Sequence, residues 1–294
     1  MVYNQITINK RNSVLLFLLF FIILTSLGYI FGYIFEFGYT GVVFGFIFAL
    51  VSALISYYYG DKLVLNISRA REVKKKEYPF LVNTIEGLSL GYGIPMPRVY
   101  VMPGNQINAF ATGRDPKNAS ISVTEGALDK LNKEELEGVL SHEISHIKNL
   151  DIRLMVLTAI MVGTIVMISD FFLRSVFFTR QDDRGKGNIQ IILFIIGIFL
   201  AILSPIFAQL IKLAISRKRE YLADSSGALL TKNPKGLANA LRKIMNDKDI
   251  LRTANHATAH LFISNPFKSK KDLFTNLFST HPPLNERIKK LEDM

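Results

Sequence analysis

The stretch His142-Glu143-Ile144-Ser145-His146 sets the expectation for the whole chain, because it carries two histidines four residues apart. On an α-helix this spacing puts both imidazoles on one face, about 6 Å apart along the axis. Such a pair can hold one metal ion, and Glu143 can take a proton from a water that the metal activates, as in metal-assisted peptide hydrolysis. The alternative is an exposed helix that carries two histidines by chance.

The residues before this stretch predict a helix. Asn132 is a good N-cap, and Glu135 follows three residues later, which is the spacing of a capping box. Apolar residues then recur at helical spacing and form the expected inward face, namely Leu136, Val139, Leu140, Ile144 and Ile147. The two histidines lie beside that face, so a metal would sit where a packed core meets a cleft.

A catalytic zinc site needs a third protein ligand and an open fourth position. The chain has no cysteine, which leaves aspartate, glutamate or another histidine. The best candidate is Glu220, followed four residues later by Asp224 on the same helical face. Glu220 could bind the metal while Asp224 accepts a hydrogen bond from a ligand imidazole. The alternative is a solvated helix whose acids balance Arg217, Lys218 and Arg219.

Near the C-terminus, His281 precedes Pro282 and Pro283, which predict a rigid extended turn. Arg287 follows at the start of a terminal helix. Such a turn could hold His281 near the oxyanion formed during hydrolysis, or Arg287 against Asp224. The alternative for His281 is a supporting or packing role.

Four segments in a shared order carry a family resemblance: Asn108-Ala109-Phe110-Ala111-Thr112-Gly113, His142-Glu143-x-x-His146, Glu220-x-x-x-Asp224, and His281-Pro282-Pro283 with Arg287. They resemble the HtpX-type membrane zinc metalloproteases, relatives of the CAAX prenyl proteases in the gluzincin group, over nearly the whole chain. The resemblance implies one Zn2+ per chain, bound by His142, His146 and Glu220. It further implies Glu143 as general base, Asp224 as support for a ligand, and Asn108, Ala109 and Phe110 on a substrate-binding edge.

Two long apolar stretches, Val14–Phe35 and Phe37–Tyr59, precede this region. They have 22 and 23 residues, so each would be about 33 Å long as a helix, enough to cross a bilayer. The first follows Lys10 and Arg11 but is too long for a signal peptide and lacks a cleavage site. It is therefore expected to remain as an anchor.

Two further apolar stretches, about Leu154–Phe178 and Ile189–Ile215, raise the expected number of transmembrane helices to about four. Asp170 lies within the first of them, and Arg174 stands four residues later, where the two can pair near an interface. These segments either cross the bilayer or line a cavity that the protein encloses.

Basic residues cluster at one side of the expected spans. Lys10 and Arg11 precede the first span, and further cations lie within residues 62–76 and 212–219, whereas the first hairpin loop carries Glu36 and no cation. The positive-inside rule then predicts a multi-pass cell-membrane protein with both termini and the active site in the cytoplasm. The net charge of +11 is assigned to contact with anionic lipid, and no nucleic-acid partner is expected.

Three short segments predict a small antiparallel sheet before the helix with the histidines: Arg98–Met102, Ile107–Thr112 and Ala119–Thr124. An edge of such a sheet can pair with an extended substrate through its backbone. The alternative for Phe110 is an ordinary core position facing inward.

The expected fold is mainly α, with a cytosolic α+β, gluzincin-like metalloprotease domain. Its parts are a membrane hairpin (1–60), a first catalytic part (61–152), a second pair of apolar helices (153–216) and a second catalytic part (217–294). The predicted function is zinc-dependent endopeptidase cleavage of damaged or misfolded membrane proteins, a substrate class that only the resemblance implies. Prenyl-protein processing and a non-catalytic zinc-binding membrane protein remain the alternatives.

Overall fold

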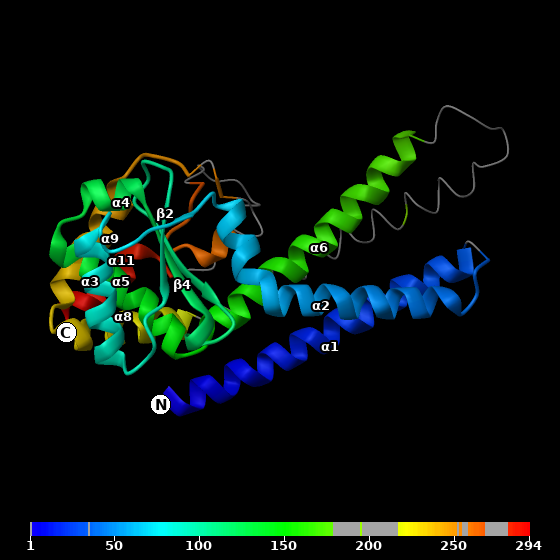
Figure 1. The fold of residues 1–294 in the computed structure, drawn as a ribbon, viewed down its shortest axis with the longest axis horizontal. Coiled ribbons are helices and arrows are strands. Elements are labelled where there is room, and N and C mark those ends of the chain that lie inside the picture. The colour runs from blue at the N-terminus through cyan, green and yellow to red at the C-terminus, as the bar shows by residue number, and fades with distance from the viewer. Residues whose placement is uncertain are drawn as a thin grey trace.

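Long helices and a separate body of mixed structure make up this computed structural model, which describes residues 2–34, 36–178, 195, 217–251, 253–254, 258–267 and 282–294. Helices α1, α2 and α6 extend away from the body that contains the sheet and the other helices (Figure 1). The elements are α1 Val2–Ile34, α2 Thr40–Ile67, β1 Arg71–Glu72, α3 Pro79–Tyr92, β2 Arg98–Met102, β3 Ala109–Gly113, η1 Pro116–Asn118, β4 Ala119–Thr124, α4 Glu125–Lys130, α5 Lys133–Lys148, α6 Asp151–Phe178, α8 Arg217–Thr231, α9 Pro234–Asn246, η3 Ala259–Leu261 and α11 Leu284–Glu292.

Three of the described helices are long and apolar enough to cross a membrane, and each overlaps one of the predicted spans. The candidate spans are Ile6–Tyr33, Thr40–Ile67 and Asp151–Phe171. Many of their large apolar side chains are exposed, as expected for surfaces that contact lipid. The predicted fourth stretch, Ile189–Ile215, lies outside the described residues except for Ile195. The division of the chain into four parts stays a prediction.

Glycines bring the first two membrane helices into backbone contact. A methyl group added to Gly28 of α1 would overlap the carbonyl oxygen of Gly41 in α2, and one added to Gly45 would lie 2.7 Å from the carbonyl oxygen of Leu24. Small residues four apart are a common means of close helix packing in lipid, where no hydrophobic force draws helices together. The close packing of α1 against α2 therefore requires glycine at these positions.

We expect Gly41→Ala to destabilise the detergent-purified protein, because the new methyl group meets backbone atoms that must move apart. Overpacking of this kind costs about 1–3 kcal/mol, which is roughly a 2–10 °C fall in melting temperature for a chain of this size. Gly87→Ala in α3 is the matched control, since no heavy atom lies within 4 Å of its added Cβ. Equal melting temperatures for the two variants would contradict the close helix contact.

The sheet has the strand order β1-β2-β4-β3. Strands β2 and β4 have the predicted bounds, and β3 begins at Ala109, two residues later than predicted. The prediction of a purely antiparallel sheet is wrong for one pair, because β2 and β4 run parallel. The connection after β2 crosses the end of β4, where Thr124 Oγ1 donates to Gln106 O (2.7 Å) and Gly126 N donates to Gly104 O (2.9 Å). This crossing puts β3 at the outer edge of the sheet.

Helix α5 is the central element of the body, in contact with α3, α8, α9 and the strands β3 and β4. Its predicted capping box is present: Glu135 N donates to Asn132 Oδ1 (2.9 Å), and Asn132 N donates to Glu135 Oε2 (2.8 Å). The predicted apolar face is buried, as are both histidines and Glu143. Because the helix is enclosed on several sides, its polar side chains must find partners inside the protein.

Candidate metal centre

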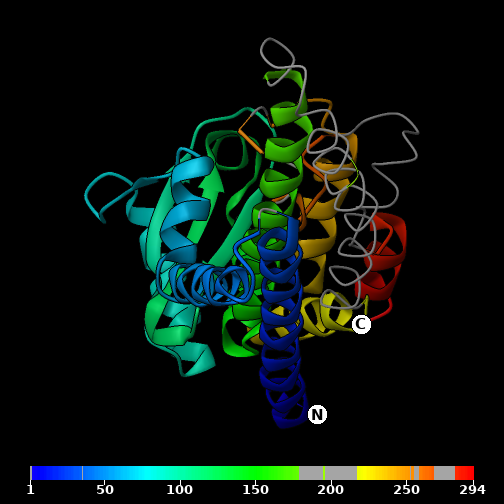
Figure 2. The same ribbon diagram turned by 90° about the vertical axis from the view of Figure 1, so that its right-hand side faces the viewer.

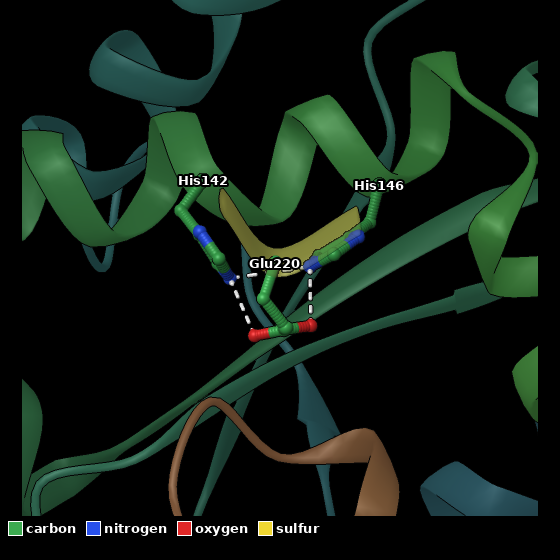
Figure 3. A group of neighbouring side chains, drawn as sticks. All are labelled: His142, His146 and Glu220. Atoms are coloured by element: carbon green, nitrogen blue, oxygen red, sulfur yellow. Dashed lines mark hydrogen bonds and ion pairs between the residues drawn. The ribbon is translucent and has the colours of Figure 1, made fainter. Parts of the chain in front are cut away.

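Two helices bring His142, His146 and Glu220 together (Figure 3). Helix α5 supplies the imidazoles one turn apart, and α8 supplies the carboxylate. The Nε2 atoms of the two histidines are 3.1 Å apart. Glu220 Oε2 lies 3.8 Å from His142 Nε2, and Glu220 Oε1 lies 3.5 Å from His146 Nε2. All three side chains are buried, so the group forms an enclosed set of nitrogen and oxygen donors.

These distances fit the ligand set of a single zinc ion. Tetrahedral zinc with bonds of about 2.0–2.1 Å places its ligand atoms roughly 3.3–3.4 Å from one another. The three separations of 3.1, 3.5 and 3.8 Å lie on both sides of that value. Small side-chain movements would therefore suffice to bind the ion.

The charge around the three residues also fits a divalent cation. The buried cluster contains four carboxylates and two guanidinium groups, which leave a formal charge of −2 when both imidazoles are neutral. These groups are Glu143, Asp151, Glu220 and Asp224 with Arg219 and Arg287. Buried charge is costly unless it is balanced, and one divalent cation would balance this set.

Asp224 contacts the imidazole of His142, and Arg287 donates hydrogen bonds to Asp224. Its Nδ1 lies 2.9 Å from Asp224 Oδ1. Arg287, which is fully buried, donates from Nε to Asp224 Oδ2 (2.8 Å) and from a terminal nitrogen to Oδ1 (2.7 Å). Burial raises the pKa of Asp224, but the Arg287 charge and the bond to His142 outweigh it and lower that pKa to about 2. Asp224 therefore stays ionised and keeps His142 Nε2 directed at the ligand group.

His146 has its own aspartate, which the sequence reasoning missed. Asp151 Oδ2 lies 2.9 Å from His146 Nδ1. Burial lowers the pKa of His146, but the hydrogen bond to Asp151 and the charge of Glu220 outweigh it and raise that pKa to about 9. The only sequence signal was an acid five residues after His146, just beyond the helix. Leu150 turns the chain there with φ of 60°, a conformation uncommon for a leucine.

The structure also places the other predicted residues except His281. Glu143 lies on α5 and is 2% exposed. Asn108 and Phe110 are buried, with Asn108 Nδ2 donating to Ser264 O (3.2 Å) and Phe110 packed edge-on against Phe262. Ala109 O accepts a hydrogen bond from Ile263 N (2.9 Å), so this part of the β3 edge is paired within the chain. His281 lies outside the described residues.

The candidate membrane spans and the buried group of two histidines and a glutamate are the features expected of a membrane-anchored metalloprotease. Residues 75–294 match peptidase family M48, and the chain belongs to that family.

Two protease HtpX homologs are similar to this chain over almost its full length. The chain is 46% identical to a protease HtpX homolog of Caldanaerobacter subterraneus subsp. tengcongensis, over 97% of this chain and 95% of the relative. It is 40% identical to a protease HtpX homolog of Lactobacillus helveticus, with both chains fully covered. The crystal structure of S. mikatae Ste24p is similar in fold, with a TM-score of 0.52 and 20% identity over 98% of this chain and 66% of that one.

Proposed function

We propose that this protein is a zinc-dependent endopeptidase that cleaves damaged or misfolded membrane proteins at the cytosolic surface. The observation that carries the proposal is the convergence of His142, His146 and Glu220 in one buried group, with each imidazole held by an aspartate. Two imidazoles and one carboxylate form a donor set typical of catalytic zinc. No fourth protein ligand joins the group among the described residues, which supports an open position for substrate and water.

The residues of the chain can then be given roles in hydrolysis. When bound, zinc acidifies an attacking water and polarises the scissile carbonyl. Glu143 takes the proton from that water and returns it to the leaving amine. Asp224 and Asp151 hold the Nδ1 protons of His142 and His146, which keeps both Nε2 lone pairs available for the metal. Arg287 fixes the carboxylate of Asp224 through two hydrogen bonds.

Removing the metal should abolish hydrolysis. We expect the purified protein to cut an unfolded test protein, to stop when 1,10-phenanthroline is added, and to recover when Zn2+ is returned, because Glu143 alone cannot activate water sufficiently. Zinc content measured in parallel should rise and fall with activity. Hydrolysis that persists in the metal-free protein would refute a metallopeptidase mechanism.

Proximity to the bilayer supports membrane proteins as the substrate class. Helix α6, the third candidate span, begins at Asp151, the residue that holds His146. Cleavable segments would thus lie close to the membrane surface. An extended substrate would pair with β3, which is an edge strand of the sheet and follows Asn108 directly.

The proposed orientation can be tested with single cysteines, since the chain has none of its own. Tyr39, in the α1–α2 turn, is 83% exposed, and Leu229, on α8, is 71% exposed. We would replace each with cysteine in turn. A membrane-impermeant maleimide should label Tyr39→Cys in intact cells and Leu229→Cys only after permeabilisation. The reverse pattern would place the metal centre outside the cytosol.

A further inference from the structure

Asn9 is an amide side chain in the first membrane helix, yet it is only 1% exposed. A buried polar group is costly unless it is hydrogen-bonded. Figure 2 shows the N-terminal part of α1 passing beside α8, at the base of the catalytic body. The partners of Asn9 therefore identify what α1 does there.

The amide of Asn9 uses both of its donors and its acceptor. Its Nδ2 donates to Asn149 O (3.0 Å), at the end of α5, and to Asp151 Oδ1 (2.7 Å), at the start of α6. Its Oδ1 accepts a hydrogen bond from Arg219 of α8 (2.9 Å). A primary amide offers two N–H groups and one carbonyl. Asn9 thus joins three segments of the chain through one side chain.

Two of the partners of Asn9 are directly connected to a proposed metal ligand: Asp151 by a contact with His146, and Arg219 by its position in the chain next to Glu220. The second oxygen of Asp151 lies 2.9 Å from His146 Nδ1, so the carboxylate is held between Asn9 and the histidine. Arg219 immediately precedes Glu220 and also lies 3.4 Å from Asp151 Oδ1. Asp151 Oδ1 thus has a short hydrogen bond from Asn9 and a longer contact with Arg219, and removal of the Asn9 amide would leave the longer one.

We propose that Asn9 is a positioning residue of the metal centre. By holding Asp151 and Arg219 together, it sets the orientation of His146 and the distance between α5 and α8. The inference rests on the proposed zinc site and extends it: the metal centre is complete only when the first membrane helix is docked against the body.

The test compares Zn2+ affinity in Asn9→Ala and in Asn12→Ala, a matched control three residues along the same helix. Loss of a residue that orients a ligand weakens metal binding about 10- to 100-fold. We expect that loss in Asn9→Ala, measured by competition with a chromophoric chelator, together with a changed visible spectrum after Co2+ substitution. Asn12→Ala should match the wild type in both. Wild-type affinity and spectrum in a folded Asn9→Ala protein would overturn the proposal.

Two further experiments distinguish loss of the Asn9–Asp151 hydrogen bond from a general loss of folding. Asn9→Asp keeps the shape and the acceptor for Arg219 but cannot donate to Asp151, so it should also weaken Zn2+ binding. In an Asp151→Asn background, Asn9→Ala should have little additional effect on Zn2+ affinity, because the two residues act in series. Independent, additive effects would mean that Asn9 only tethers α1. If the wild type itself binds no Zn2+, the proposed function fails instead.

Discussion

Glu143→Gln should abolish peptide hydrolysis and leave zinc bound. Glutamine has nearly the same shape as glutamate but cannot take a proton from water, so the variant loses the general base without losing a proposed ligand. A positioned base contributes about 10²–10⁴-fold to rate, and we expect a fall in kcat of that size. The measurement is cleavage of an unfolded test protein by wild type and variant at matched zinc content.

Glu137→Gln is the control for this experiment, because Glu137 lies on the same helix, is only partly buried and has no assigned role. It should keep wild-type activity. If Glu143→Gln retains activity, another group is the base. If it loses zinc along with activity, Glu143 supports the metal rather than the proton transfer.

Glu220→Gln should remove most of the zinc affinity. Loss of a residue that only orients a ligand lowers metal affinity about 10- to 100-fold. Loss of a charged ligand should lower the Zn2+ affinity at least as much. The protein should still fold, because Arg287 lies 3.5 Å from Glu220 but keeps both of its bonds to Asp224. Zn2+ affinity can be read by chelator competition and by the rise in melting temperature that a bound ion produces.

The comparison with Glu286→Gln makes this result specific. Glu286 is exposed on α11, where it accepts a hydrogen bond from Tyr221 and has no proposed role in metal binding. That variant should bind zinc as the wild type does. Unchanged zinc binding in Glu220→Gln would show that Glu220 is not the third ligand, and Asp224, on the same helix, would become the residue to test next.

Local pattern was enough to predict several elements. Helix α5 could be predicted because capping and helical periodicity depend on residues within a few positions of one another. The same holds for β2 and β4, whose bounds agree with the prediction. The three candidate spans follow from length and apolar composition alone.

Other features depend on contacts between distant residues. The parallel pairing of β2 with β4 arises because a loop crosses the end of β4, which no strand pattern encodes. Asp151 was overlooked because a turn at Leu150, outside the regular helix, directs it back to His146. Asn9 is separated from Asp151 by 142 positions, and its sequence context is that of an ordinary membrane anchor.

By itself, the sequence determined the helix with the two histidines, the three apolar spans and the short list of residues able to bind a metal, because spacing and side-chain chemistry are local properties. Only the tertiary structure decided that Glu220 lies between the imidazoles, that a separate aspartate holds each imidazole, and that Asn9 connects the membrane anchor to the metal centre. Those outcomes depend on how α1, α5 and α8 pack together, and packing is a property of the whole chain.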